Sequence, residues 1–392
     1  MKLRPVEQLV LQGTPFCNIN CTYCDLSEES RRNKARMPIE LVDKLLNELI
    51  DESLIAENLV VVWHSGEPLT LTPEYYTVAI ETITSLVEQR APHVKLAFDI
   101  QTNATLINKE WCDFFEKYSD LVNLGVSCDG PETLHDAFRV DRKGNSTFAR
   151  TLSGMRALEA RGIKYNAIAV VTRKTIENVL PFLDFFYERR DFLTDFHFNV
   201  LASPIDGHID LTYGADDRAT YATFYSELLD WWITKNQAGD EFPIRNFTQA
   251  FERLAYSDQP DAPLFIEESS APLRSLNLDI EGNVTTFYAG LDVGTAPNRY
   301  GDGQGLAIGN INHSSISDML SSQKFAAIVD DFSATQQRCR EFCEYYSVCT
   351  GGFELIQWEK AKPFNPESPE SIECIIHVKA MTDSVLNVIE NN

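Results

Sequence analysis

The stretch Cys17-Asn18-Ile19-Asn20-Cys21-Thr22-Tyr23-Cys24 places three thiols within eight residues, in the pattern C-x3-C-x2-C. A loop of this length can wrap three thiolates around one corner of a [4Fe-4S] cube. One iron then stays open for a small-molecule ligand, whereas cubes with four cysteine ligands are closed electron carriers. Structural zinc is the alternative, but it needs a fourth Cys or His close by. The next ones along the chain are His64, His93 and Cys112. The spacing therefore favours an open iron–sulfur site.

The length and composition indicate a globular, cytoplasmic protein. A chain of 392 residues can hold a domain of about 200 to 250 residues and a smaller one. No apolar run reaches about 18 residues, and residues 1–10 lack the long apolar segment of a secretory signal. Nine cysteines in such a chain are better interpreted as ligands or buried thiols than as disulfides.

The net charge of −24 excludes two classes of partner. Such a surface repels nucleic acid and anionic lipid, so neither is expected to bind. It is compatible with a cationic segment of a peptide substrate, although solubility alone also explains it. The charge therefore says little about the substrate.

The first two-thirds of the chain alternate short apolar runs with longer amphipathic ones, the pattern of βα units around a parallel sheet. Strands are predicted at residues 9–11, 59–63, 95–102, 121–127, 165–171 and 196–200. Helices are predicted after Pro38, from Pro73 to about 89, and at 109–117, 148–161 and 176–187. The fold class is therefore α/β, with a partial (β/α)6 barrel.

Polar motifs follow these strands. The cysteine loop comes after the first strand and His64-Ser65-Gly66-Glu67-Pro68 after the second. Gln101 with Asn103, Ser127 with Asp129, and Asn199 mark later strand ends. In a βα barrel, functional residues collect at the carboxyl ends of the strands, so these motifs are expected to converge.

The pattern changes after Leu201. A long helix is predicted at residues 213–235, while 236–275 carries several prolines and little periodicity. A hairpin pattern at 276–287 turns at Glu281-Gly282-Asn283, and a helix is predicted at 317–330. We therefore predict a barrel at 1–235, a bridging region at 236–275 and a C-terminal domain at 276–392.

A second group of cysteines lies near the end of the chain. Cys339, Cys343 and Cys349 are spaced C-x3-C-x5-C, and Cys374 follows 25 positions later. Four thiols suggest a closed site, either a second [4Fe-4S] cluster or a structural zinc, and spacing alone does not separate the two. The iron–sulfur assignment of the first site favours an iron–sulfur cluster at the second as well, because radical chemistry often needs an electron acceptor. The isolated Cys112 and Cys128 are interpreted as buried thiols.

Together these motifs resemble the radical S-adenosylmethionine (SAM) superfamily. The resemblance rests on the C-x3-C-x-Tyr-C loop, the Ser-Gly-Glu-Pro turn and Ser127-Cys128-Asp129-Gly130. The cysteine-rich tail looks like a SPASM/twitch extension. Residues 63–69, 300–302, 309–311 and 339–352 look most like the GrrM-type maturases, which form cyclophanes in ribosomal peptides.

The resemblance implies roles for individual residues. Cys17, Cys21 and Cys24 would hold the cluster whose open iron binds SAM, and Cys339, Cys343, Cys349 and Cys374 would hold one auxiliary [4Fe-4S] cluster. Contacts to SAM would come from Tyr23, Ser65, Gly66, Glu67, Asn103, Ser127, Asp129 and Arg139. An ordinary salt bridge is the alternative for Arg139. One departure stands out: full SPASM proteins carry a cysteine in the hairpin after the barrel, and residues 282–288 have none.

The resemblance also implies a reaction. A 5′-deoxyadenosyl radical would remove a Cβ hydrogen from a precursor peptide, and the carbon radical would attack an aromatic ring two positions earlier. Asp279 and Asp210 are candidate proton acceptors, and a flavodoxin or ferredoxin is the expected electron donor. Thioether formation, epimerisation and sulfatase-type Ser or Cys oxidation are alternatives within the class. A zinc-stabilised scaffold without catalysis is the alternative outside it.

Overall fold

The computed structural model describes residues 3–201, 215–257, 271–286, 298–349, 351, 370 and 374–391. One sheet of nine strands organises them, in the order β6-β5-β4-β3-β2-β1-β7-β8-β9. Its first six strands are parallel, and consecutive strands are neighbours. They are β1 (Val6–Leu11), β2 (Ile55–Trp63), β3 (Lys95–Thr102), β4 (Val122–Ser127), β5 (Tyr165–Val171) and β6 (Leu193–Val200).

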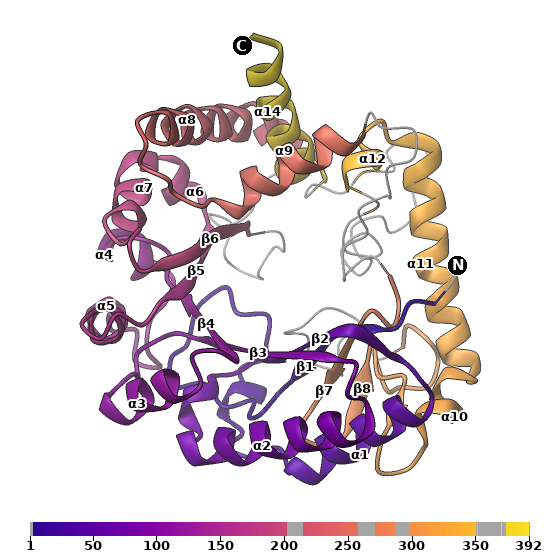
Figure 1. Ribbon diagram of the computed structural model, residues 1–392. Coiled ribbons are helices and arrows are strands. Elements are labelled where there is room, and N and C mark those ends of the chain that lie inside the picture. Colours follow the sequence, from indigo (N-terminus) through magenta and orange to yellow (C-terminus); the bar gives the residue numbers. More distant parts are fainter. Residues whose placement is uncertain are drawn as a thin grey trace.

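The helices that connect these strands cover the outer face of the sheet (Figure 1). They are α1 (Ile39–Asp51), α2 (Pro73–Arg90), α3 (Lys109–Lys117), α4 (Glu132–His135), α5 (Phe148–Glu159), α6 (Arg173–Ile176) and α7 (Val179–Tyr187). Aromatic rings fill part of the layer between them and the sheet. The rings of Phe186 on α7 and Phe196 on β6, for example, stack with centroids 4.2 Å apart. Burial of such rings is a main source of fold stability.

The sheet continues past the barrel on the side of β1. Strand β7 (Ser275–Leu278) pairs in parallel with β1, and β8 (Asn283–Thr285) and β9 (Gly309–Asn310) follow as antiparallel strands. The predicted hairpin is thus present. Its place beside β1 was not predicted, because no local pattern encodes pairing between segments about 270 residues apart.

The rest of the chain returns to the other edge of the sheet. From α10 (Ile316–Leu320), α11 (Gln323–Phe342) runs along one side of the ring seen in Figure 1 to α12 (Tyr346–Cys349). There α12 contacts α9 (Arg245–Ser257), and α14 (Ala380–Asn391) packs on α8 (Arg218–Gln237) and α9. The second cysteine group therefore lies where the ring closes.

The edge strand β6 is covered rather than open. Phe196 donates its N–H to the carbonyl of Pro243 (3.1 Å), and the Asn246 side chain bonds both backbone groups of Phe198 (3.0 and 2.9 Å). Covering an edge in this way removes a template for pairing with another chain.

Every strand and most helices that we predicted are present, and three predictions need correction. The helix predicted at 176–187 begins later, at Val179, because Pro181 is tolerated in the first turn of α7 but not inside a longer helix. The helix predicted at 317–330 is two helices, since Ser322 caps α11 through the N–H of Phe325 (3.1 Å). Helix α9 lies in the segment judged to have little periodicity, although Phe247, Phe251 and Leu254 are spaced as one apolar helical face.

Cys112 and Cys128 are fully buried, as predicted. No helix in the described ranges is long and apolar enough to span a membrane.

Candidate active site and auxiliary cysteine site

The cysteine loop after β1 is attached to the end of β3 by asparagine side chains. Asn103 donates to the Oδ1 of Asn18 (2.9 Å), and Asn18 donates to the hydroxyl of Thr105 (2.7 Å). The Nδ2 of Asn103 also lies 4.0 Å from the Sγ of Cys17. Asn103, predicted to contact SAM, thus lies at the loop and holds its conformation.

The turn after β2 packs against the same loop. Ser65 and Gly66 both have positive φ angles, +71° and +76°. A Cβ at Gly66 would come within 2.3 Å of the carbonyl oxygen of Thr14, so only glycine fits this close approach. A left-handed conformation at Ser65 stores backbone strain of the kind found at functional sites. The predicted Ser65-Gly66-Glu67 motif therefore lies beside the cysteine loop.

The side chain of Glu67 ties β2 to β3. Its carboxylate accepts hydrogen bonds from the hydroxyl of Thr102 (2.5 Å) and from the N–H groups of Asn103 (2.8 Å) and Leu69 (3.0 Å). It is 1% exposed, and burial raises its pKa to about 7 despite these donors. The carboxylate is engaged by the protein, and the backbone N–H of Glu67 donates to the carbonyl of Phe16 (2.7 Å), so Glu67 holds the turn against the cysteine loop.

Tyr23, Asp129 and Arg139 form one buried group. The hydroxyl of Tyr23 donates to Asp129 (2.5 Å), and the guanidinium of Arg139 pairs with both oxygens of Asp129 (3.0 Å each). The N–H of Val170 also donates to Asp129 (2.9 Å). Arg139 thus forms the salt bridge that was its alternative interpretation. Both oxygens of Asp129 are occupied, and burial raises the pKa of Tyr23 well above its usual value.

The other strand-end residues behave differently. Gln101 donates to the hydroxyl of Ser127 (2.8 Å), which joins the ends of β3 and β4. A Cβ at Gly125 would lie 2.1 Å from the Oε1 of Gln101, so this glycine makes room for the Gln101 side chain. Asn199, near the end of β6, is exposed.

Two arginines that support the loop were missed in the sequence. Arg31 donates to the Oδ1 of Asn20 (2.6 Å) and is 8% exposed. Arg142 donates to the backbone carbonyls of Cys17 (2.9 Å) and Arg31 (2.5 Å). A side chain that bonds only backbone carbonyls requires no particular residue type at its partners, so the sequence contains no motif that would indicate the role of Arg142.

The three thiols suit a soft metal cluster. Cys17, Cys21 and Cys24 are free and partly exposed, so one loop offers three thiol ligands at its surface. Burial is the main cause that raises the pKa of Cys21 to about 12, and Arg139 opposes it. Binding of an iron–sulfur cluster would deprotonate these thiols, as for any thiolate ligand.

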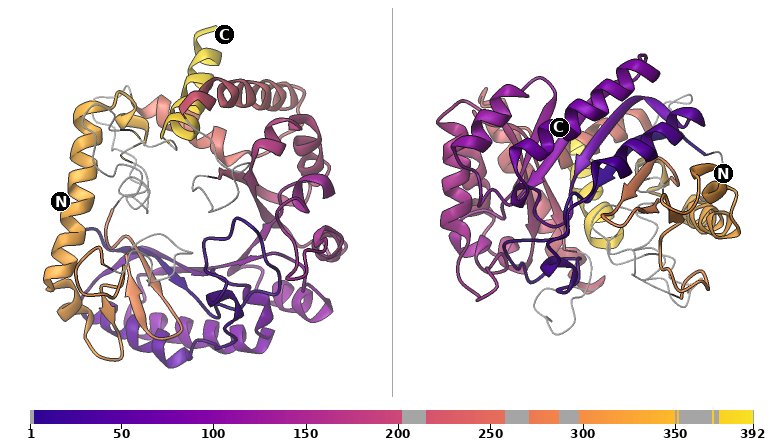
Figure 2. Two further views of the ribbon diagram at one scale, coloured as in Figure 1. Left: turned by 180° about the vertical axis from the view of Figure 1, so that it is seen from behind. Right: turned by 90° about the horizontal axis from the view of Figure 1, so that it is seen from below.

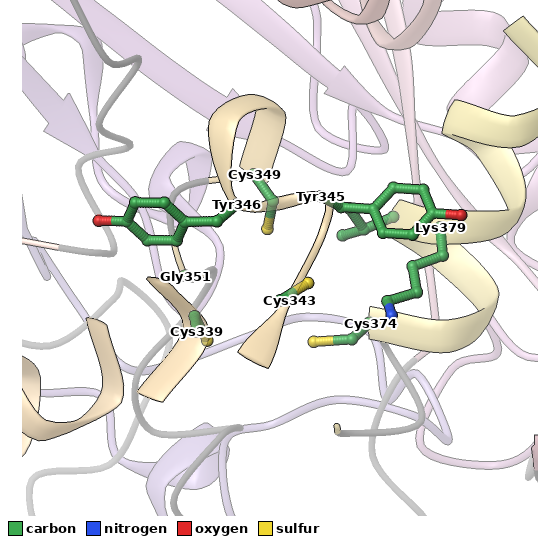
Figure 3. A pocket seen from close by; sticks show the side chains of 9 residues that line it. Cys339, Cys343, Tyr345, Tyr346, Cys349, Gly351, Cys374 and Lys379 are labelled. Atoms are coloured by element: carbon green, nitrogen blue, oxygen red, sulfur yellow. The ribbon is translucent and has the colours of Figure 1, made fainter. Parts of the chain in front are cut away.

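The four C-terminal cysteines line one hollow (Figure 3). Cys339 and Cys343 lie at the end of α11, Cys349 ends α12, and Cys374 begins the π-helical turn η6 (Cys374–Lys379). The hollow measures about 280 Å³, including open solvent at its mouth. Burial, and next the nearby Cys374, raise the pKa of Cys349 to about 12 and that of Cys339 to about 11. In the described ranges, no group of three or more His, Cys, Asp or Glu side chains could hold a metal ion as it stands.

A network of charged side chains surrounds this hollow. Lys379 lines it, is 7% exposed and forms an ion pair with Glu370. Its Nζ lies 4.8 Å from the centre of the Tyr345 ring. The hydroxyl of Tyr345 donates to Asp383 on α14 (2.5 Å), and Asp383 pairs with Arg218 on α8 (2.7 Å). The cysteine hollow is thereby linked to the helices that follow the barrel.

Of the two candidate proton acceptors, Asp279 already uses its carboxylate within the protein. The carboxylate of Asp279 accepts hydrogen bonds from the N–H groups of Glu281 and Asn283 (2.9 Å each) and from the Asn283 side chain (2.8 Å). These bonds shape the hairpin turn. Asp210 lies outside the described residues.

Six parallel strands with a three-cysteine loop at the carboxyl end define an iron–sulfur enzyme built on a partial barrel. Residues 11–186 match the model of the radical SAM superfamily, so the barrel is a radical SAM domain and the protein is an enzyme. Its cofactors are therefore SAM and the [4Fe-4S] cluster that binds it.

Two solved structures share this fold, and a curated relative matches most of the chain. A cysteine-type anaerobic sulfatase-maturating enzyme of Clostridium novyi is 22% identical over 89% of this chain and 88% of its own. The solved structure of anSMEcpe with bound AdoMet is 20% identical and covers 99% of this chain and 96% of its own, with a TM-score of 0.75. SuiB of Streptococcus suis, bound to the precursor peptide SuiA, is 18% identical and covers 96% and 76%, with a TM-score of 0.62.

Proposed function

We propose that this enzyme modifies a ribosomal precursor peptide by joining the Cβ of one residue to the aromatic ring of another. The observation that carries the proposal is the pairing of two cysteine sites in one ring-shaped fold, one with three thiols and one with four. Similarity to sulfatase-maturating enzymes and to SuiB with its precursor peptide supports a peptide as the substrate.

The first site would generate the radical. Cys17, Cys21 and Cys24 would hold the cluster, and one electron delivered there would split bound SAM into methionine and a 5′-deoxyadenosyl radical. The backbone of Ser65 and Gly66, with Ser127, would contact SAM, and Glu67 would hold their turn against the cysteine loop. Asn103 would hold the cysteine loop, and the Tyr23–Asp129–Arg139 group would hold this loop against the end of β4. Such a closed site matters because stray solvent or reductant would quench the radical.

The second site would finish the reaction. Abstraction of the Cβ hydrogen yields 5′-deoxyadenosine, and attack on the ring forms the carbon–carbon bond. The ring must then lose one electron and one proton to become aromatic again. An auxiliary [4Fe-4S] cluster on Cys339, Cys343, Cys349 and Cys374 would accept the electron, and four thiols around one hollow fit such a group. Asp279 and Asp210 stay the candidates for the proton.

Residues 282–288 contain no cysteine, so one auxiliary cluster is expected instead of the two of full SPASM proteins. Sulfatase-type oxidation of Ser or Cys is the second candidate, because the similarity to a sulfatase-maturating enzyme spans most of both chains.

The test is an anaerobic reaction of purified enzyme, SAM and dithionite with each short peptide that the neighbouring reading frames encode. Crosslinking predicts loss of two hydrogen atoms, a fragmentation gap between the joined residues and no reaction with a hydrazide. A hydrazide-reactive aldehyde would instead establish the sulfatase-type oxidation. Exchange of an α-hydrogen with deuterated solvent would establish epimerisation, and a new sulfur–carbon bond a thioether.

A further inference from the structure

The surface around the cysteine loop is basic, although the whole chain carries a net charge of −24. Residues 31–36 read Arg-Arg-Asn-Lys-Ala-Arg, and Arg32, Lys34 and Arg36 are exposed. Arg142 and Lys143, from the segment after α4, are exposed as well. These five side chains, Arg32, Lys34, Arg36, Arg142 and Lys143, are here named the basic collar.

Direct contacts place the core of the collar at the cluster loop. The guanidinium of Arg142 donates to the carbonyl of Cys17, so the second segment is attached to a cluster ligand. The Nζ of Lys34 and the guanidinium of Arg142 lie 5.3 Å and 5.8 Å from the centre of the Phe16 ring. Phe16 is partly exposed and directly precedes Cys17. Two cations therefore flank an aromatic ring that adjoins the first cysteine.

Acidic side chains nearby do not cancel the collar. Residues 25–36 and 141–143 hold six basic and four acidic side chains, a net charge of +2. Glu28 pairs with Arg32, and Asp141 accepts hydrogen bonds from the N–H groups of Lys143 (2.7 Å) and Asn145 (2.9 Å). Asp25 and Glu29 are exposed without a comparable role in the loop. The view from behind in Figure 2 shows the indigo loop between β1 and α1 that carries most of the collar.

We propose that the basic collar is the docking surface for a small acidic one-electron carrier protein of the flavodoxin type. The proposal rests on the proposed function, because it assigns the carrier to the cluster of Cys17, Cys21 and Cys24. The carrier loses one electron and the cluster gains it. The chain as a whole is negative and repels an acidic protein, whereas the collar offers it positive charge beside the first cysteine. The electron then enters beside Phe16 and does not pass through the C-terminal cysteine site.

The test is the charge reversal Lys34→Glu/Lys143→Glu, which spares Arg142 and its bond to Cys17. The matched control is Arg4→Glu/Lys164→Glu, with the same charge change at exposed residues just before β1 and β5, at the amino ends of the strands. Formation of 5′-deoxyadenosine is measured with reduced flavodoxin at low salt and, separately, with dithionite. Flavodoxin binding is measured by calorimetry.

We expect the Lys34→Glu/Lys143→Glu enzyme to lose about tenfold in rate and affinity with flavodoxin, since charge complementarity acts mainly on association. Its rate with dithionite should match that of the wild type, and the loss should fade at high salt. An unchanged flavodoxin rate would overturn the proposal. So would an equal loss with both donors, which marks a misfolded loop, or a raised KM for the peptide under dithionite, which marks docking of an acidic peptide segment.

Failure of the proposed function would look different. Wild-type enzyme that forms no 5′-deoxyadenosine with dithionite would refute the radical chemistry, while the calorimetric comparison would still decide whether the collar binds the carrier.

Discussion

The two cysteine sites of this protein are built in opposite ways. The N-terminal site takes its three thiols from one loop, and side chains from the ends of β2 and β3 and from the segment after α4 fix that loop. The C-terminal site gathers its four thiols from α11, α12 and η6, at the place where the ring of helices closes. The first site is a local motif held by a scaffold, whereas the second is assembled by the packing of three helical elements.

The sharpest way to break this comparison is to remove one thiol from each site. Cys21→Ala should abolish formation of 5′-deoxyadenosine and remove about four irons per chain, because two thiols do not retain an open cube. The measurements are iron analysis after anaerobic reconstitution and chromatography of the SAM products. Retention of SAM cleavage would refute the assignment of the loop.

Cys374→Ala should also remove about four irons but leave SAM cleavage intact. The peptide product should be lost, because the final electron has no acceptor. Limited proteolysis should cut before α14 faster than in the wild type, since Cys374 anchors this helix in the ring. Normal crosslinking by this variant would exclude the C-terminal site as the electron acceptor.

The buried Asp129–Arg139 pair is expected to matter more than a pair at the second site. Asp129→Asn leaves a buried guanidinium without its charge partner, and we expect a loss of about 3–5 kcal/mol in unfolding free energy. The control is Asp383→Asn, which breaks the more exposed pair with Arg218 and should cost below about 1 kcal/mol. Denaturant titration of the cluster-free protein measures both. Equal losses of unfolding free energy in the two variants would show that the buried Asp129–Arg139 pair does not matter more than the exposed pair.

The close approach at Gly66 can be separated from its backbone strain. Gly66→Ala meets the carbonyl of Thr14 and also forces a positive φ, so we expect a cost of about 1–3 kcal/mol or more. Gly144→Ala forces a similar φ of +78° but meets no atom within 4 Å. It should cost only about 1–2 kcal/mol. Identical costs in denaturant titration would mean that the turn does not press on the cysteine loop.

The smallest effect concerns Lys379 at the second site. Removal of its positive charge in Lys379→Met should lower the midpoint potential of the auxiliary cluster, because the reduced cluster is the more negative state. Glu370→Gln should raise the potential, since Glu370 partly neutralises Lys379. Redox titration followed by electron paramagnetic resonance measures both shifts. Shifts in the same direction would show that the ion pair acts through structure and not through charge.

Much of the barrel was predictable because its signals are local. The apolar runs at 95–102 and 165–171 fixed β3 and β5 to the residue, and Pro73 fixed the start of α2. Prediction failed at helix starts: α7 begins at Val179, which keeps Pro181 in its first turn, and Ser322 caps a new helix, α11, that periodicity had joined to α10. For the site, residue type and position at a strand end located Asn103, Glu67 and Asp129, but not the bonds that occupy their side chains.

The sequence by itself determined the chemistry of this protein. Thiols spaced C-x3-C-x2-C and C-x3-C-x5-C must lie near one another, because a few residues of chain cannot separate them far. Only the tertiary structure decided that β7 extends the sheet beside β1, and that Tyr23 and Arg139 engage both oxygens of Asp129. Those contacts join segments far apart in the chain, and their closure depends on packing of the whole fold, which no local pattern records.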